Sequence, residues 1–195
     1  MRRTLRGCRG FTLAELLIVV AILGFVMAAI FTLQQQGQLA YLTGAARVEV
    51  QQNARLALDT MISDLRLALP VPGTTRMVTE IDGACDTGAP PGTGGGLSIR
   101  FRDQNDNDTT YQLVGASCAT SATGCDLQRN GVTVVGGIQE LRIWCYNASG
   151  ALNDTLADIR EIRIHIRTRS ERSPAAGSAG DQHAVVEGRV RFRNV

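Results

Sequence analysis

A long apolar run near the start of the chain constrains it more than any other feature. From Phe11 to Leu33 the only charged residue is Glu15. These 23 residues would extend about 34 Å as a helix, which is enough to cross the hydrocarbon core of a bilayer. A carboxylate near the middle of such a segment costs roughly 2.5–3.5 kcal/mol on insertion scales. Glu15 lies nearer one end, where the cost is lower, but it still requires a partner.

The segment before this run, MRRTLRGCRG, contains four arginines and no acid. Such a charge bias keeps a short segment in the cytoplasm and sends the rest of the chain outward. Cleavage between Gly10 and Phe11 would create an α-amino group four residues from Glu15, on the same face of a helix. An ordinary secretory signal is cut after its apolar region at an A-x-A-like site, which this run lacks. The pattern therefore predicts a leader, residues 1–10, that is removed before the apolar run.

A basic leader that ends in Gly10, followed by FTLAE at 11–15 and the apolar run, resembles a type IV prepilin. The resemblance covers residues 7–33. It implies that a prepilin peptidase cuts after Gly10 and methylates the new amino terminus at Phe11. It also implies that Glu15 pairs with a subunit amino terminus as a filament assembles.

Helical signals continue beyond the membrane-spanning stretch at 11–33. No proline occurs between Phe11 and Leu69, and Pro70 and Pro72 then end the pattern. The spacing predicts one near-continuous helix of about 88 Å, whose second part, 34–69, is amphipathic. Its apolar stripe recurs every three or four residues at Leu42, Ala46, Val50, Ala54, Leu58, Met61, Ile62, Leu65 and Leu69.

Three glycines interrupt the predicted helix at positions 24, 37 and 44. Each weakens a helix by roughly 1 kcal/mol relative to alanine. They either allow a bend or local melting when subunits pack together, or are small residues that the helix tolerates; both interpretations stay open.

Two stretches indicate a particular branch of the prepilin family. Residues 52–58 with 64–68 resemble the helix end of PilW-type minor pilins, and residues 189–194 resemble their last strand. The J-type pseudopilins of type II secretion have a similar layout. The likeness favours the pilus member over the secretion member.

Beyond Pro72 the hydrophobic period changes from helical to two. Alternating runs predict strands at 97–102, 109–113, 127–129, 132–135, 138–146 and in two last strands around Ile162–Ile166 and Val190–Phe192. Asn130-Gly131 is a strong signal for a two-residue hairpin. One face of these strands is apolar and the other rich in arginine. The chain is therefore expected to be α+β, with residues 70–195 forming an antiparallel sheet that packs on the helix. Residues 87–96 and 173–182 are predicted loops.

Five cysteines occur, and Cys8 belongs to the leader. The other four would lie beyond the membrane, in a compartment that permits disulfides, and allow three pairings. We favour Cys118–Cys125, because these two flank a short turn rich in serine, threonine and glycine, which leaves Cys85 with Cys145. A zinc site is the alternative, but the chain has no C-x-x-C and only two histidines.

The search for chemistry yields no catalytic set. His165 alternates outward on a predicted strand, His183 adjoins a predicted loop, and neither has a nucleophile motif nearby. Residues 103–108 (DQNDND) offer alternating oxygen ligands for calcium, but Asp108 stands where an EF-hand needs glycine and Val114 where it needs glutamate. This segment is better interpreted as a solvated hairpin tip.

Charge does not point to nucleic acid. The formal net charge of the chain is +2, from 20 basic and 18 acidic residues. Removing the four leader arginines leaves 16 basic against 18 acidic residues, a net charge of −2. The arginines expected on the last two strands could meet DNA, an acidic partner pilin or only water. These arginines are Arg160, Arg163, Arg167, Arg169, Arg189, Arg191 and Arg193. Docking to neighbouring minor pilins is the favoured interpretation.

Together these features predict a minor pilin rather than an enzyme, with no cofactor and no metal. The expected partners are a prepilin peptidase, other minor and major pilins, and the pilus assembly platform of the inner membrane. The chain would cross the bacterial inner membrane once, with its N-terminus cytoplasmic and its head periplasmic, and would then join the pilus at the cell surface. The alternatives are a pseudopilin of type II secretion and a DNA- or surface-binding adhesin.

Overall fold

The computed structural model describes residues 11–82, 85, 98–115, 118, 124–152, 155–170 and 181–192. It confirms the predicted α+β class: one long N-terminal helix, α1 (Leu13–Arg66), is followed by an antiparallel sheet. The chain divides after Tyr41 into two compact units. The first holds the N-terminal part of α1 and is called the N-terminal unit. The second begins at Leu42, holds the rest of α1 and the sheet, and is called the head unit.

Helix α1 is shorter than predicted at its C-terminal end. It ends at Arg66, and the next two amides, of Leu67 and Ala68, bond to carbonyls three residues earlier, as in a tightening last turn. Leu69, predicted to be helical, instead forms an isolated bridge with Arg102. The residue before a proline is disfavoured in the helical region, so Pro70 acts one turn earlier than the sequence pattern suggested.

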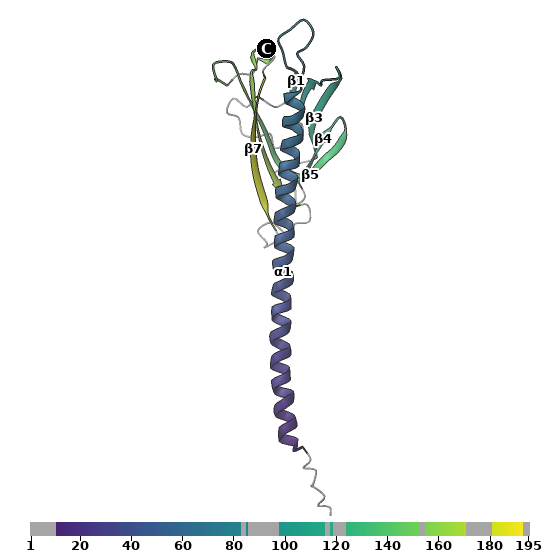
Figure 1. Ribbon diagram of the computed structural model, residues 1–195, viewed down its shortest axis with the longest axis vertical. Coiled ribbons are helices and arrows are strands. Elements are labelled where there is room, and N and C mark those ends of the chain that lie inside the picture. The colour runs from purple at the N-terminus through teal and green to yellow at the C-terminus, as the bar shows by residue number, and fades with distance from the viewer. Residues whose placement is uncertain are drawn as a thin grey trace, which may run out of the picture. The chain divides into compact units, whose positions relative to one another are not determined.

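The sheet keeps its strands in chain order, and each strand is antiparallel to the next (Figure 1). A short 3-10 turn, η1 (Leu156–Asp158), precedes the sixth strand. Among the described residues the strands are β1 (Val78–Asp82), β2 (Ser98–Arg102), β3 (Asp108–Val114), β4 (Cys125–Arg129), β5 (Val132–Tyr146), β6 (Glu161–Arg169) and β7 (His183–Arg191).

The hairpin predicted at Asn130-Gly131 is confirmed. Both residues have a positive φ, 51° and 80°, as a two-residue turn of type I′ requires. The two strands predicted after it, 132–135 and 138–146, are wrong as separate elements because β5 runs through both. Between them β5 contains one residue more than β4, which makes a bulge at Gly136-Gly137. A glycine pair therefore marks a bulge here rather than a strand end.

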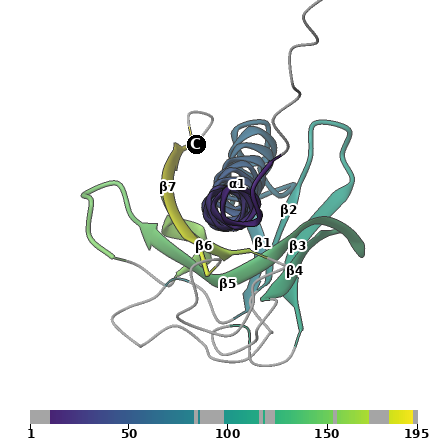
Figure 2. The same cartoon turned by 90° about the horizontal axis from the view of Figure 1, so that it is seen from below.

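The core of the head unit lies between α1 and the sheet. Within the predicted stripe from Val50 to Leu65 every residue is buried except Ile62, which is partly buried, and Ala57 joins the buried set. Leu42 was expected in this stripe, but 62% of its surface is exposed. On β6 the isoleucines 162, 164 and 166 are fully buried, and Figure 2 shows the sheet curving around the helix.

Strand β7 approaches the helix so closely that one position has no room for a side chain. A Cβ added at Gly188 would lie 2.2 Å from Ile62 Cδ1 and 2.9 Å from Leu58 Cδ1. Thr168, on the neighbouring strand β6, donates a hydrogen bond of 2.9 Å from its hydroxyl to the carbonyl of Val50. These contacts fix the last two strands against the amphipathic part of α1.

Two disulfides close the head unit, Cys85–Cys145 and Cys118–Cys125, which is the pairing that the sequence favoured. Their sequence separations are 60 and 7 residues. In the chain-entropy model the longer loop corresponds to about 4 kcal/mol of stabilisation and the shorter one to about 2 kcal/mol. The longer bridge therefore contributes more to holding the head together.

Candidate functional site

The start of α1 carries a reciprocal capping arrangement between Thr12 and Glu15. The Thr12 amide donates to Glu15 Oε2 at 3.0 Å, and the Thr12 hydroxyl donates to the same oxygen at 3.1 Å. In return the Glu15 amide donates to Thr12 Oγ1 at 3.3 Å. This is a capping box, in which the residue before the helix and the third helical residue satisfy each other's free amides. This box was not predicted, although the T-x-x-E pattern at 12–15 is its sequence signal.

The capping box gives Glu15 a partner within its own chain. Its carboxylate lies in the first turn, where the positive end of the helix dipole also stabilises its negative charge. Both donors reach Oε2, and among the described residues no group donates to Oε1. One oxygen of the carboxylate is therefore hydrogen-bonded, and the other is open to a cation from outside the chain.

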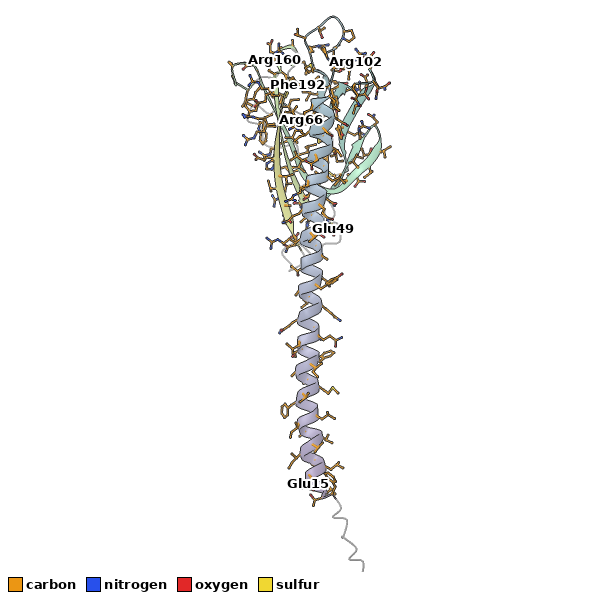
Figure 3. The ribbon with its side chains drawn as sticks, in the orientation of Figure 1. Glu15, Glu49, Arg66, Arg102, Arg160 and Phe192 are labelled. Carbon is orange, nitrogen blue, oxygen red and sulfur yellow. A yellow bond between two sulfur atoms is a disulfide. The ribbon has the colours of Figure 1, made fainter. Side chains whose placement is uncertain are left out.

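The surroundings of Glu15 are apolar and uncovered. Every residue from Phe11 to Leu42 is exposed. Even Val26, the least exposed large hydrophobic residue of this stretch, has 49% of its surface exposed. The helix is long and apolar enough to cross a membrane. Figure 3 shows the side chains of this part standing out from α1, with Glu15 at its lower end. An all-round apolar helix of this kind needs an apolar environment that the N-terminal unit itself does not supply.

Of the three residues expected to act together at this end, the structure describes Phe11 and Glu15. Phe11 lies directly before the capping residue, and 82% of its surface is exposed. The Glu15 carboxylate bonds to Thr12 and not to Phe11. Gly10, with the rest of the leader, lies outside the described residues.

The acidic segment at 103–108 is the tip of the hairpin between β2 and β3. Asp103 Oδ1 accepts the amides of Asn105 at 2.8 Å and Asn107 at 2.9 Å, and Asp106 forms an ion pair with Arg102. The carboxylates thus shape the turn, which agrees with the hairpin interpretation. Within the described part of the chain no cluster of three or more acids, histidines or cysteines is arranged to hold a metal ion.

Two arginines of the arginine-rich face pair with neighbouring glutamates, whereas among the described residues Arg167 and Arg191 are exposed and have no ion pair. Arg163 pairs with Glu187 at 2.7 Å and Arg189 pairs with Glu161 at 2.7 Å. Hydrogen bonds from His165 and from Arg163 lower the pKa of Glu187. The glutamates among these arginines weaken the attraction of this face for a polyanion, whose binding depends on uncompensated cations.

Two of the predicted face arginines are placed elsewhere. Arg169 is buried, and its Nε lies 2.8 Å from Asp181 Oδ1. Arg160 precedes β6 rather than lying on it, and its guanidinium donates to two backbone carbonyls. Its own carbonyl accepts the amide of Phe192, and Figure 3 shows both residues at the same end of the head unit. Arg193 lies outside the described residues, as do the predicted loop 87–96 and residues 173–180 of the predicted loop 173–182.

The two histidines are engaged in local pairs. His165 Nδ1 lies 3.0 Å from Glu187 Oε1, and its ring meets the Trp144 ring edge-on with centroids 6.0 Å apart. His183 Nε2 lies 3.3 Å from Asp181 Oδ1. No nucleophile or third catalytic group accompanies either pair among the described residues.

Comparison with protein families adds one finding. The model of the prokaryotic N-terminal methylation motif matches residues 5–31, a stretch that includes Gly10, Phe11 and Glu15. Comparisons with curated proteins and with solved structures find no match. The motif is of the prepilin type, and with the α+β fold it supports a protein of the type IV pilin and pseudopilin class. It also fits processing by a prepilin peptidase and anchoring in a membrane.

Proposed function

We propose that the chain is a minor pilin, a structural subunit that helps to initiate type IV pilus assembly and is incorporated at or near the pilus tip. One observation carries this proposal: Glu15 is the only carboxylate of the exposed apolar stretch 11–33, and among the described residues its Oε1 has no hydrogen-bond donor. A buried carboxylate demands a cation, and a new amino terminus is the cation that processing would supply.

The proposed route begins in the inner membrane. The leader, residues 1–10, stays cytoplasmic, residues 11–33 span the bilayer, and the head is periplasmic. A prepilin peptidase cuts after Gly10 and methylates Phe11. The helix continues over 34–66, and residues 70–195 form the periplasmic β-sheet domain.

Assembly then exchanges one apolar environment for another. The apolar part of α1 leaves lipid for the helices of neighbouring subunits, at little hydrophobic cost because lipid tails and apolar side chains are similarly apolar. Glu15 pairs with the amino terminus of a neighbouring minor or major pilin, supported by the assembly platform of the inner membrane. This pairing sets the axial register, since only one offset along the filament brings the two charges together.

The test is the composition of sheared filaments. Glu15→Ala is expected to leave membrane insertion intact but to lower the amount of this chain in filaments at least about tenfold, because it removes one member of a charge pair in a water-poor core. Asp59→Ala is the matched control, since Asp59 is an exposed acid on the head part of the same helix. Equal amounts of the wild type and the Glu15 variant in filaments would contradict the proposed role.

Mass spectrometry of the same filaments tests the processing step. The chain is expected to begin at an N-methylated Phe11, and a functional chain that retains Arg2 or Arg3 would overturn the proposal.

Deletion of the gene separates the pilus role from the secretion role. Loss of surface filaments and twitching supports the minor pilin, whereas loss of exoprotein secretion alone supports a type II secretion pseudopilin.

A further inference from the structure

A groove in the head unit runs between α1 and the beginning of β7. Its helix side consists of Arg47, Gln51 and Arg55, and its strand side consists of Gln182 and the first four residues of β7. Figure 2 shows β7 beside α1, which agrees with the close contact at Gly188. The three helix residues are spaced by four, so they share one face of α1.

The groove carries two cations without a counter-ion. Arg47 and Arg55 are exposed, and among the described residues neither has a hydrogen bond or an ion pair. Several other head arginines are paired with acids; Arg129, for example, lies 2.7 Å from Asp64. Asp181, which directly precedes Gln182 on the strand side, is already engaged by Arg169 and His183.

The strand wall of the groove is also a sheet edge. All nine residues of β7 pair with β6 on one side, and in the described sheet β7 is a terminal strand. The backbone amides and carbonyls of such an edge can pair with an added extended chain. The pairing with β6 is continuous, without the bulge that interrupts the other terminal strand, β1.

We propose that this groove binds an extended acidic segment of another protein subunit, in which two carboxylates are four residues apart. Arg47 and Arg55 are eight residues apart, which corresponds to about 12 Å along a helix. Four residues of extended chain cover about 13 Å and place both side chains on the same face. Guanidinium groups bind carboxylates through paired hydrogen bonds, so each arginine would take one acid.

The features of the groove favour a peptide over a nucleic acid. A nucleic acid would need a continuous series of free cations, whereas on the outer face of β6 and β7 Arg163 pairs with Glu187 and Arg189 pairs with Glu161, so acids interrupt the arginines there. The chain beyond the leader carries 16 basic against 18 acidic residues, so it does not attract a polyanion as a whole. A sheet edge, in contrast, provides backbone pairing that only a peptide can use. The proposal concerns the head alone and does not depend on the role of Glu15.

Peptide binding to the full chain in detergent micelles tests this inference by fluorescence anisotropy. The probe is a labelled peptide of threonine and valine with glutamates at its second and sixth positions. Wild-type protein is expected to bind it, and the double variant Arg47→Gln with Arg55→Gln to bind it at least about tenfold more weakly, because two charge-assisted contacts are lost. Arg66→Gln, an exposed arginine of the same helix outside the groove, is expected to bind it as the wild type does.

A second peptide, with its glutamates two residues apart, sharpens the test. It spans only about 7 Å between carboxylates, so it is expected to reach one arginine and to bind more weakly than the first peptide. Absence of binding to the first peptide, or an equal loss in the Arg66 variant, would overturn the proposal. So would tighter binding of single-stranded oligothymidylate that is lost in the double variant, since that would assign the groove to nucleic acid.

Discussion

The two parts of α1 share one backbone conformation and differ in what covers them. From Phe11 to Tyr41 every residue is exposed, and the side chains are apolar on all sides up to Leu33. From Val50 to Leu65 one stripe is buried under the sheet and the opposite face is polar. The head part of the helix therefore finds its apolar partner in its own chain. The N-terminal part must find one outside the chain, first in lipid and then, as we propose, in neighbouring subunits.

Truncating one methionine in each part should give the largest contrast. Met61 is fully buried in the head core, whereas 59% of Met27 is exposed. We expect Met61→Ala to lower the free energy of unfolding of the head by about 2–5 kcal/mol, because it removes buried contacts and leaves a cavity. Met27→Ala should change it by less than about 0.5 kcal/mol. Thermal unfolding of the full chain in detergent, followed by near-ultraviolet circular dichroism, measures both. Equal losses would mean that the two parts of α1 are not covered differently.

A smaller effect is expected at the polar contact that joins α1 to the sheet. Asp64 Oδ2 accepts the Tyr111 hydroxyl at 2.7 Å and Arg129 Nε at 2.7 Å. Asp64→Ala leaves the buried Tyr111 hydroxyl without its acceptor, so we expect a loss of about 1–3 kcal/mol in head stability.

The control for this contact is Asp59→Ala, which removes an exposed acid five residues earlier on the same helix. It should change the stability by less than about 0.5 kcal/mol. If urea unfolding gives the same midpoint for both variants, the contact adds nothing to the docking of the sheet on the helix.

The sequence predicted the local elements well because their signals are local. The apolar helix, the buried stripe from Val50 onward and the hairpin at Asn130-Gly131 each follow from neighbouring residues. The capping box was also within reach, since Thr12 and Glu15 are three residues apart.

The failures of prediction concern contacts between distant segments. Asp64 meets residues that are 47 and 65 positions away, and Arg169 is buried against Asp181 although its strand pattern placed it outward. Leu42 continues the helical stripe, yet 62% of its surface is exposed. Periodicity shows which face of an element is apolar; it does not show where the covering element stops.

The smallest expected effect depends on pH and again separates the two units. Burial, together with the hydrogen bond to Asp64, raises the pKa of Tyr111 above its ordinary value of 10.0. The folded head thus holds this proton more tightly than the unfolded chain does. The resulting stabilisation is fully present below about pH 10, the unfolded value, and is lost as the pH rises toward the folded value. Tyr111→Phe should therefore flatten the decline of head stability above pH 10.

Tyr41 provides the matched comparison, because 75% of it is exposed in the N-terminal unit. Tyr41→Phe should leave the alkaline decline as it is in the wild type. Urea unfolding midpoints measured at pH 8, 10 and 11 on the three proteins give the slopes directly. An alkaline slope that persists in the Tyr111 variant would show that another group controls it, and the contact with Asp64 would then hold the helix and the sheet together without coupling their stability to this proton.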